Sequence, residues 1–137
     1  MKLGKSGIVL WALYTAFAIY ALASGLQENT FDFTGPLGSI KALTWLALIS
    51  FLSYSIYCSF QENFFRSVRS IATLKWGRQI GADLYLGLCI SLFIIYLNDG
   101  LLAAAIWLIP ILIYANLVVL LYLALNFDCI VAKLLGL

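Results

Sequence analysis

Four long apolar stretches dominate the sequence and constrain its fold more than any other feature. They cover roughly residues 7–25, 38–60, 80–97 and 101–125. A helix needs roughly 20 mostly apolar residues to cross a bilayer, so each stretch is close to that length. Inside lipid the backbone must satisfy its own hydrogen bonds, which favours helices. The sequence therefore predicts an all-α integral membrane four-helix bundle, a single transmembrane domain over residues 1–137.

The composition argues against a water-soluble fold. Hydrophobic residues make up 64% of the chain and charged residues 10%, against about 25% charged residues in typical soluble domains. So few charges cannot cover the surface of a soluble protein, whereas lipid solvates apolar helix faces. The net charge of +2 is too small to suggest nucleic-acid binding. We expect the lipid bilayer to be the main partner.

The distribution of basic residues predicts the orientation. Lys2 and Lys5 precede the first stretch and Lys133 follows the last, while four basic residues lie between the second and third: Arg66, Arg69, Lys75 and Arg78. If four helices alternate, the opposite side holds only Lys41. Short cytosolic loops are rich in Lys and Arg. This pattern predicts cytosolic N and C termini in a multi-pass protein of the bacterial inner membrane.

The first apolar stretch has a second interpretation. A basic start followed by an apolar core and small residues is typical of a secretory signal peptide. The stretch over 7–25 is long for such a core and contains Trp11, Tyr14 and Tyr20. These features favour a retained membrane helix.

The connection between the second and third stretches has a helical pattern of its own. Its apolar residues recur at helical spacing, while Arg66 and Arg69 fall on other faces; the apolar set is Phe64, Phe65, Val68, Ile71 and Ala72. This predicts a short amphipathic helix in the cytosolic interface, where anionic lipid attracts basic residues. Alternatively, the segment extends the second span and supplies only topology charges.

Asp83 is the first candidate functional residue. It lies about one turn inside the third span, where an ionised carboxylate is costly unless it faces water, protein or a cation. It could be a proton or cation site. Alternatively, it is an interfacial carboxylate paired with Arg78 or with a helix-start amide.

Four further polar residues are candidates for a ligand or ion site: Asn116, Tyr54, Tyr122 and Ser91. An amide or hydroxyl at membrane depth seeks a hydrogen bond across the bundle. These groups could line a small polar cavity together with Asp83, or they could hold the helices together. In the fourth span Asp99 is expected to cap the helix start, and Pro110 is expected to kink it.

Several kinds of catalytic site lack the residues they need. The chain has no histidine, and the spacings of Cys58, Cys89 and Cys129 fit no metal motif. No pair of carboxylates shares a helix face within a span, so acid–base pairs and di-metal sites lack ligands. We therefore expect no metal, no cofactor and no catalytic residues, which disfavours an enzyme.

The stretch Trp76-Gly77-Arg78-Gln79-Ile80-Gly81-Ala82-Asp83-Leu84-Tyr85-Leu86-Gly87 resembles a segment of small bacterial four-span membrane proteins of uncharacterised activity. In that family an Asp-Leu-Tyr-x-Gly run opens the third span. The fourth span is similar in style, with Tyr114-Ala115-Asn116-Leu117. The resemblance implies that Asp83, Tyr85, Gly87 and Asn116 form one functional or folding unit. In size and span number the chain also resembles small multidrug transporters, although it lacks the glutamate in the middle of their first span.

Three functional hypotheses follow. The first is a non-catalytic inner-membrane protein that acts by helix–helix association, as an accessory subunit of a membrane complex or as a small homo-oligomer. The second is a small transporter or lipophilic-ligand-binding bundle that uses Asp83 and Asn116. The third is a membrane enzyme that acts on a lipid or isoprenoid substrate.

Overall fold

The computed structural model describes residues 3–136, and every regular element in that part of the chain is a helix. The seven helices are α1 (Lys5–Gly25), α2 (Gly38–Gln61), α3 (Phe64–Ala72), α4 (Lys75–Asp99), α5 (Leu101–Tyr114), α6 (Asn116–Leu125) and α7 (Phe127–Leu134). Helices α1, α2 and α4 are long and apolar enough to cross a membrane, and α6 with α7, bent by 76°, is a fourth candidate by length and composition. The predicted all-α fold is confirmed for the described residues, and three to four helices are candidate membrane spans.

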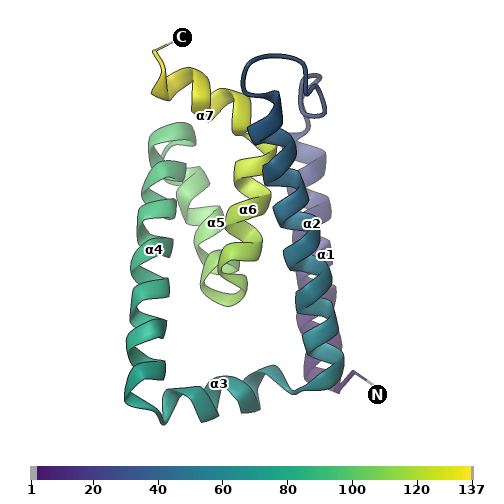
Figure 1. Ribbon diagram of the computed structural model, residues 1–137, viewed down its shortest axis with the longest axis vertical. Coiled ribbons are helices and arrows are strands. Elements are labelled where there is room, and N and C mark those ends of the chain that lie inside the picture. The colour runs from purple at the N-terminus through teal and green to yellow at the C-terminus, as the bar shows by residue number, and fades with distance from the viewer. Residues whose placement is uncertain (1–2, 137) are drawn as a thin grey trace.

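The long helices form a frame around the two short apolar helices α5 and α6. Helix α4 stands on one side and α1 and α2 on the other, while α3 connects α2 to α4 at one end of the molecule (Figure 1). At that end, the indole N–H of Trp11 on α1 donates a hydrogen bond to Ser59 Oγ on α2 at 2.9 Å. Most large apolar side chains of the long helices are exposed in the isolated chain. Lipid contact would remove this exposure from water.

Helices α5 and α6 form a hairpin inside the frame (Figure 1). The chain turns at Ala115, which has φ 51° and ψ −123°. The rings of Trp107 and Tyr122 lie 4.9 Å apart, whereas a continuous helix rising about 1.5 Å per residue would separate them by about 22 Å. The predicted single span over 101–125 is therefore wrong. The expected kink at Pro110 is not the turning point either, because Pro110 lies inside α5.

The hairpin supplies most of the buried core. Seven of the ten residues of α6 are buried, ending with Tyr122, Ala124 and Leu125. The tip of the hairpin is bonded to α1, since Tyr114 Oη donates to the carbonyl of Leu10 at 2.6 Å. Tyr14 Oη donates to the carbonyl of Leu117 at 3.5 Å. The tip thus reaches the level of residues 10–14 of α1 and stops short of α3.

The hairpin changes where the chain ends. Because α5 and α6 are antiparallel, α6 returns to the end of the molecule where α4 ends, and α7 lies across that end (Figure 1). The described chain starts at the α3 end and finishes at the opposite end. The prediction that both termini share one side is wrong for this fold. Lys133 therefore lies with the α1–α2 loop, and Lys2 is outside the described residues.

Helix α3 is a separate element, so the interpretation as a simple extension of α2 is wrong. Glu62 has an extended backbone, and the Asn63 side chain caps α3 by accepting a hydrogen bond from the backbone N–H of Arg66 at 3.2 Å. Helix α4 begins at Lys75, earlier than the expected start at residue 80. Gly77 permits this tight corner, because a Cβ atom there would lie 2.1 Å from the carbonyl oxygen of Ile71.

Candidate functional site

Three polar side chains meet where α4 passes into α5, and we call them the turn cluster: Asn98, Asp99 and Tyr122. Tyr122 is almost fully buried, and its hydroxyl donates a hydrogen bond to Asp99 Oδ2 at 2.6 Å. Asn98 Nδ2 donates to Tyr122 Oη at 2.8 Å. Asp99 therefore does not cap α5, whose start at Gly100 has no side-chain cap. Its hydrogen bond with Tyr122 instead joins the end of α6 to the end of α4.

The C-terminal segment adds to the turn cluster. Cys129 Sγ lies 3.4 Å from Asn98 Oδ1. The Lys133 ammonium donates to the backbone carbonyl of Asn98. These contacts join α7 to the end of α4.

A cavity of about 300 Å³ opens beside the turn cluster. Its walls come from the end of α1, the α4–α5 turn and the hairpin, and the residues with polar groups are Ser24, Gln27, Asp99, Trp107, Tyr122 and Asn126. This volume is at the lower end of the range for small-molecule sites. Asp99 is the one carboxylate among these lining residues, and it has capacity to accept further hydrogen bonds. The cavity can therefore accommodate a small polar or cationic molecule.

Lys41 is buried beneath the α1–α2 loop, with 2% of its surface exposed. Its ammonium donates to Asp128 Oδ2 at 2.6 Å, to the carbonyl of Asp32 at 3.0 Å and to the carbonyl of Asn29. These three acceptors satisfy its three donors. The ammonium thus joins α2, the loop and α7 in a single contact.

The loop beside Lys41 has a local hydrogen-bond network. Two hydrogen bonds from Thr34, donated by its hydroxyl at 2.6 Å and its backbone N–H at 2.9 Å, reach Asp32 Oδ1. They hold the pKa of the Asp32 carboxyl below its usual value, because they stabilise the ionised form. Asp32 thus remains an anion at neutral pH at this end of the molecule.

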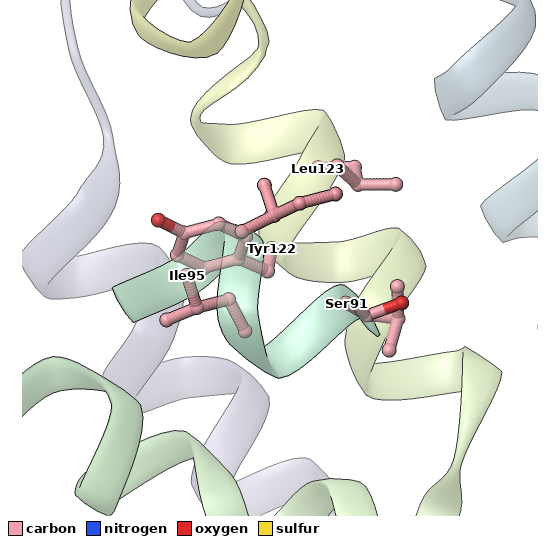
Figure 2. Close-up of a pocket in the computed structure, with 6 residues that line it drawn as sticks. Ser91, Ile95, Tyr122 and Leu123 are labelled. Atoms are coloured by element: carbon pink, nitrogen blue, oxygen red, sulfur yellow. The ribbon is translucent and has the colours of Figure 1, made fainter. Parts of the chain in front are cut away.

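Ser91 and Tyr122 lie on facing helices, as Figure 2 shows with Ile95 and Leu123. They help to line a cavity of about 30 Å³ between α4 and α6, a volume that suits at most a water molecule or two. The Ser91 hydroxyl donates to the carbonyl of Gly87 at 3.0 Å. Its hydrogen bond is therefore satisfied within its own helix.

Asp83 and Asn116 lie elsewhere. Both are exposed, and neither side chain forms a hydrogen bond or an ion pair within residues 3–136. The proposed pairing of Asp83 with Arg78 is thus not formed. Asn116 opens α6 at the hairpin tip. Neither residue lines the two cavities described above.

Tyr54 belongs to a polar stripe on α2 whose members are all exposed: Ser50, Ser53, Tyr54 and Tyr57. We call this set the α2 stripe. The rings of Tyr54 and Tyr57 stack with their centroids 6.4 Å apart. The buried face of α2 is marked by Leu48. The stripe therefore lies on the outer surface, and the five predicted ligand candidates do not converge on one cavity.

Within residues 3–136 no three Cys, Asp or Glu side chains gather closely enough to hold a metal ion. Comparison with known protein families, with curated proteins and with solved structures finds no match to this chain.

Sequence reasoning included Tyr122 but missed the partners that give it a role. Asn98 is not among the candidates from the sequence, Asp99 is predicted only as a helix cap, and Lys41 is noted only as the basic residue on the opposite side. One signal was present for Lys41, since it lies at the start of an apolar stretch with few anions in reach. A charge in such a position normally pairs with a specific partner. Asp128 becomes that partner because the hairpin returns the chain, and α7 with it, to the end of the molecule where Lys41 lies.

Proposed function

We propose that this protein acts without catalysis, by associating with other membrane chains through the outer faces of α2 and α4. The main support for the proposal is the outward position of polar groups at membrane depth, of which Ser53 alone donates a hydrogen bond to its own helix, at the carbonyl of Ile49. Asp83 is exposed and without a partner in the described chain, and the α2 stripe is exposed on its helix. Polar side chains in spans normally face protein or water rather than lipid. Contact with another chain would meet that requirement.

The charge distribution supports a location in a bacterial inner membrane with the α3 end in the cytosol. That end carries Lys5 together with four basic residues, Arg66, Arg69, Lys75 and Arg78. The opposite end has two lysines, Lys41 and Lys133, among Glu28, Asp32, Asp99 and Asp128. Basic residues are enriched in cytosolic segments. In this orientation α1, α2 and α4 cross the bilayer, and α5–α6 forms a re-entrant hairpin.

Cross-linking in native membranes tests the association. The chain, of 15.2 kDa, is expressed at a low level and treated in membranes with a photo-cross-linker whose reaction does not depend on amines or carboxylates. The products are then analysed in a mild detergent. We expect species larger than the monomer both after cross-linking and on a native gel. A variant with Ser50→Ala and Tyr54→Phe should shift the population towards monomer. If the unchanged chain and the variant are both monomeric in every condition, the proposal is refuted.

The cavity beside the turn cluster favours a second candidate function, binding of a small cation. Asp99 supplies the negative charge, and Ser24, Gln27 and Asn126 supply hydrogen-bonding groups. Methylammonium can be titrated into the purified protein while the fluorescence of Trp107 is followed in a variant without the other tryptophans. Saturable quenching that disappears in Asp99→Asn supports this function, and an equal response of both proteins excludes it. The alternative of a lipid or isoprenoid enzyme stays a prediction.

A further inference from the structure

The carboxylate of Asp83 and the α2 stripe lie at matching depths. Helix α3 connects the end of α2 at Gln61 to the start of α4 at Lys75, so depth can be counted from it along both helices. At about 1.5 Å per residue, Tyr54 lies about 11 Å above the end of α2, and Asp83 about 12 Å above the start of α4. Side chains on parallel or antiparallel helices at equal depth can meet if the helices come into contact.

Within one copy these groups cannot meet. Helices α2 and α4 stand on opposite sides of the hairpin (Figure 1). Leu48 and Leu88 mark the buried faces of the two helices, whereas Tyr54 and Asp83 are exposed. At 100° per residue, Asp83 is turned about 140° away from Leu88. Tyr54 and Asp83 therefore cannot pair within one copy, and both are accessible to a neighbouring molecule.

The two surfaces are chemically complementary. An ionised carboxylate only accepts hydrogen bonds, whereas the hydroxyls of Ser50 and Tyr54 can donate them. A symmetric contact through α4 would bring two Asp83 carboxylates together, which is repulsive. A symmetric contact through α2 would leave Asp83 in lipid, where a charge is costly. Among these contacts between copies of the chain, the one between α2 of one copy and α4 of the next satisfies both surfaces.

We propose that the partner of this surface is a second copy of the chain, with the α2 stripe of one molecule against the Asp83 face of α4 in the next. The proposal rests on the association proposed above and specifies its partner. Gly87 lies one turn above Asp83, and a Cβ atom there would meet nothing within 4 Å. The neighbouring backbone can therefore approach closely at this point. Because the two contacting surfaces differ, the assembly is head-to-tail and forms a ring or a chain.

Disulfide trapping tests this arrangement directly. Cys58 lies one turn below Tyr54, Gln79 lies one turn below Asp83, and both are exposed. The variant Gln79→Cys is made with Cys89→Ser and Cys129→Ser, so that Cys58 and the new thiol are the only cysteines. Mild oxidation in membranes should give a ladder of dimers, trimers and larger species, because every copy carries both thiols. Arg78→Cys in the same background is the control, since it has similar depth but a different face, and it should give no ladder.

Single-cysteine versions separate the alternatives. A dimer formed by Cys58 alone indicates a symmetric α2 contact, and one formed by Gln79→Cys with Cys58→Ser indicates a symmetric α4 contact. Either result as the dominant product overturns the head-to-tail arrangement. So does the absence of any disulfide product. If a photo-cross-linked complex persists without the ladder, the association stands and this inference fails; a lone monomer in both assays removes both.

Substitution of the polar groups tests whether they hold the contact. Asp83→Leu, or Ser50→Ala with Tyr54→Phe, should each lower the yield of ladder by about threefold or more, the effect of losing an average interhelical hydrogen bond in a membrane. All these side chains are exposed, so the fold should tolerate the changes. Thr15→Val is the matched control, because Thr15 is exposed on α1 and bonds to its own backbone. An undiminished ladder in both variants would contradict the proposed pairing.

Discussion

Single residues decide where the fourth apolar stretch turns. Ala115 has a positive φ of 51° without being glycine, a backbone conformation that costs about 1–3 kcal/mol for an L residue with a side chain. The surrounding bonds hold it there: the Tyr114 hydroxyl bonds to Leu10, and the Tyr14 hydroxyl bonds to Leu117. The turn is thus maintained by contacts with α1 rather than by the local preference of the chain.

Replacing Ala115 by glycine should therefore stabilise the protein. Glycine adopts positive φ without strain, and we expect the free energy of unfolding in detergent to rise by about 1 kcal/mol. Thermal unfolding followed by circular dichroism measures the change. Ala47→Gly is the control, because Ala47 is exposed within α2 and should lose about 1 kcal/mol as an ordinary helical position. Equal destabilisation by both changes would show that residue 115 is helical in the detergent-solubilised protein.

Among the charged residues, substitution of Lys41 should lower the free energy of unfolding most. Lys41→Met removes three hydrogen bonds and leaves the carbonyls of Asn29 and Asp32 without their donor. We expect a loss of roughly 2 kcal/mol in unfolding free energy. Asp128→Asn should cost less, about 1 kcal/mol, because half of the Asp128 side chain is exposed and can be rehydrated. Thermal unfolding in detergent ranks the two, and the opposite ranking would contradict the role given to Lys41.

At the scale of elements, α3 has no partner within the described chain for its apolar face. None of its residues is buried, and Phe64, Phe65, Val68 and Ile71 are each about half exposed or more. Arg66 and Arg69 occupy other faces. Such a helix is stable in the membrane interface, where the apolar face enters lipid and the basic face stays in water.

Cysteine labelling can test this position of α3. Val68→Cys and Ser70→Cys are both exposed in the folded chain, so only lipid can make their reactivities differ. In a background without Cys58, Cys89 and Cys129, a water-soluble maleimide should modify residue 70 several times faster than residue 68 in membranes. After the protein has been unfolded in denaturant without detergent, the two labelling rates should become equal. Equal rates in the membrane would place α3 in water.

At the scale of the whole molecule, the proposed orientation has an odd number of complete crossings, because the hairpin returns to the end of the molecule from which it starts. With α1, α2 and α4 as the crossings, the start and the end of the chain lie on opposite sides of the bilayer. We expect a reporter that is active only in the cytosol to be active at the N-terminus and inside the α3 segment, and inactive after residue 137. A reporter active only outside should show the reverse. Cytosolic activity at both ends would restore a fourth crossing and contradict the hairpin.

The sequence by itself determines most of the helical elements of this protein, because helix length and the spacing of apolar residues are local properties of the chain. Residues 7–25 and 38–60 appear as α1 and α2 almost at the predicted bounds, and the apolar spacing from Phe64 to Ala72 marks α3. The path of residues 101–125 is decided only by tertiary structure. A straight span and a hairpin can be built from the same apolar composition, and residue 115 is an alanine rather than the Gly or Pro that would mark a turn. Distant contacts made by Tyr14, Tyr114 and Tyr122 distinguish them, and those contacts also create the turn cluster and the burial of Lys41.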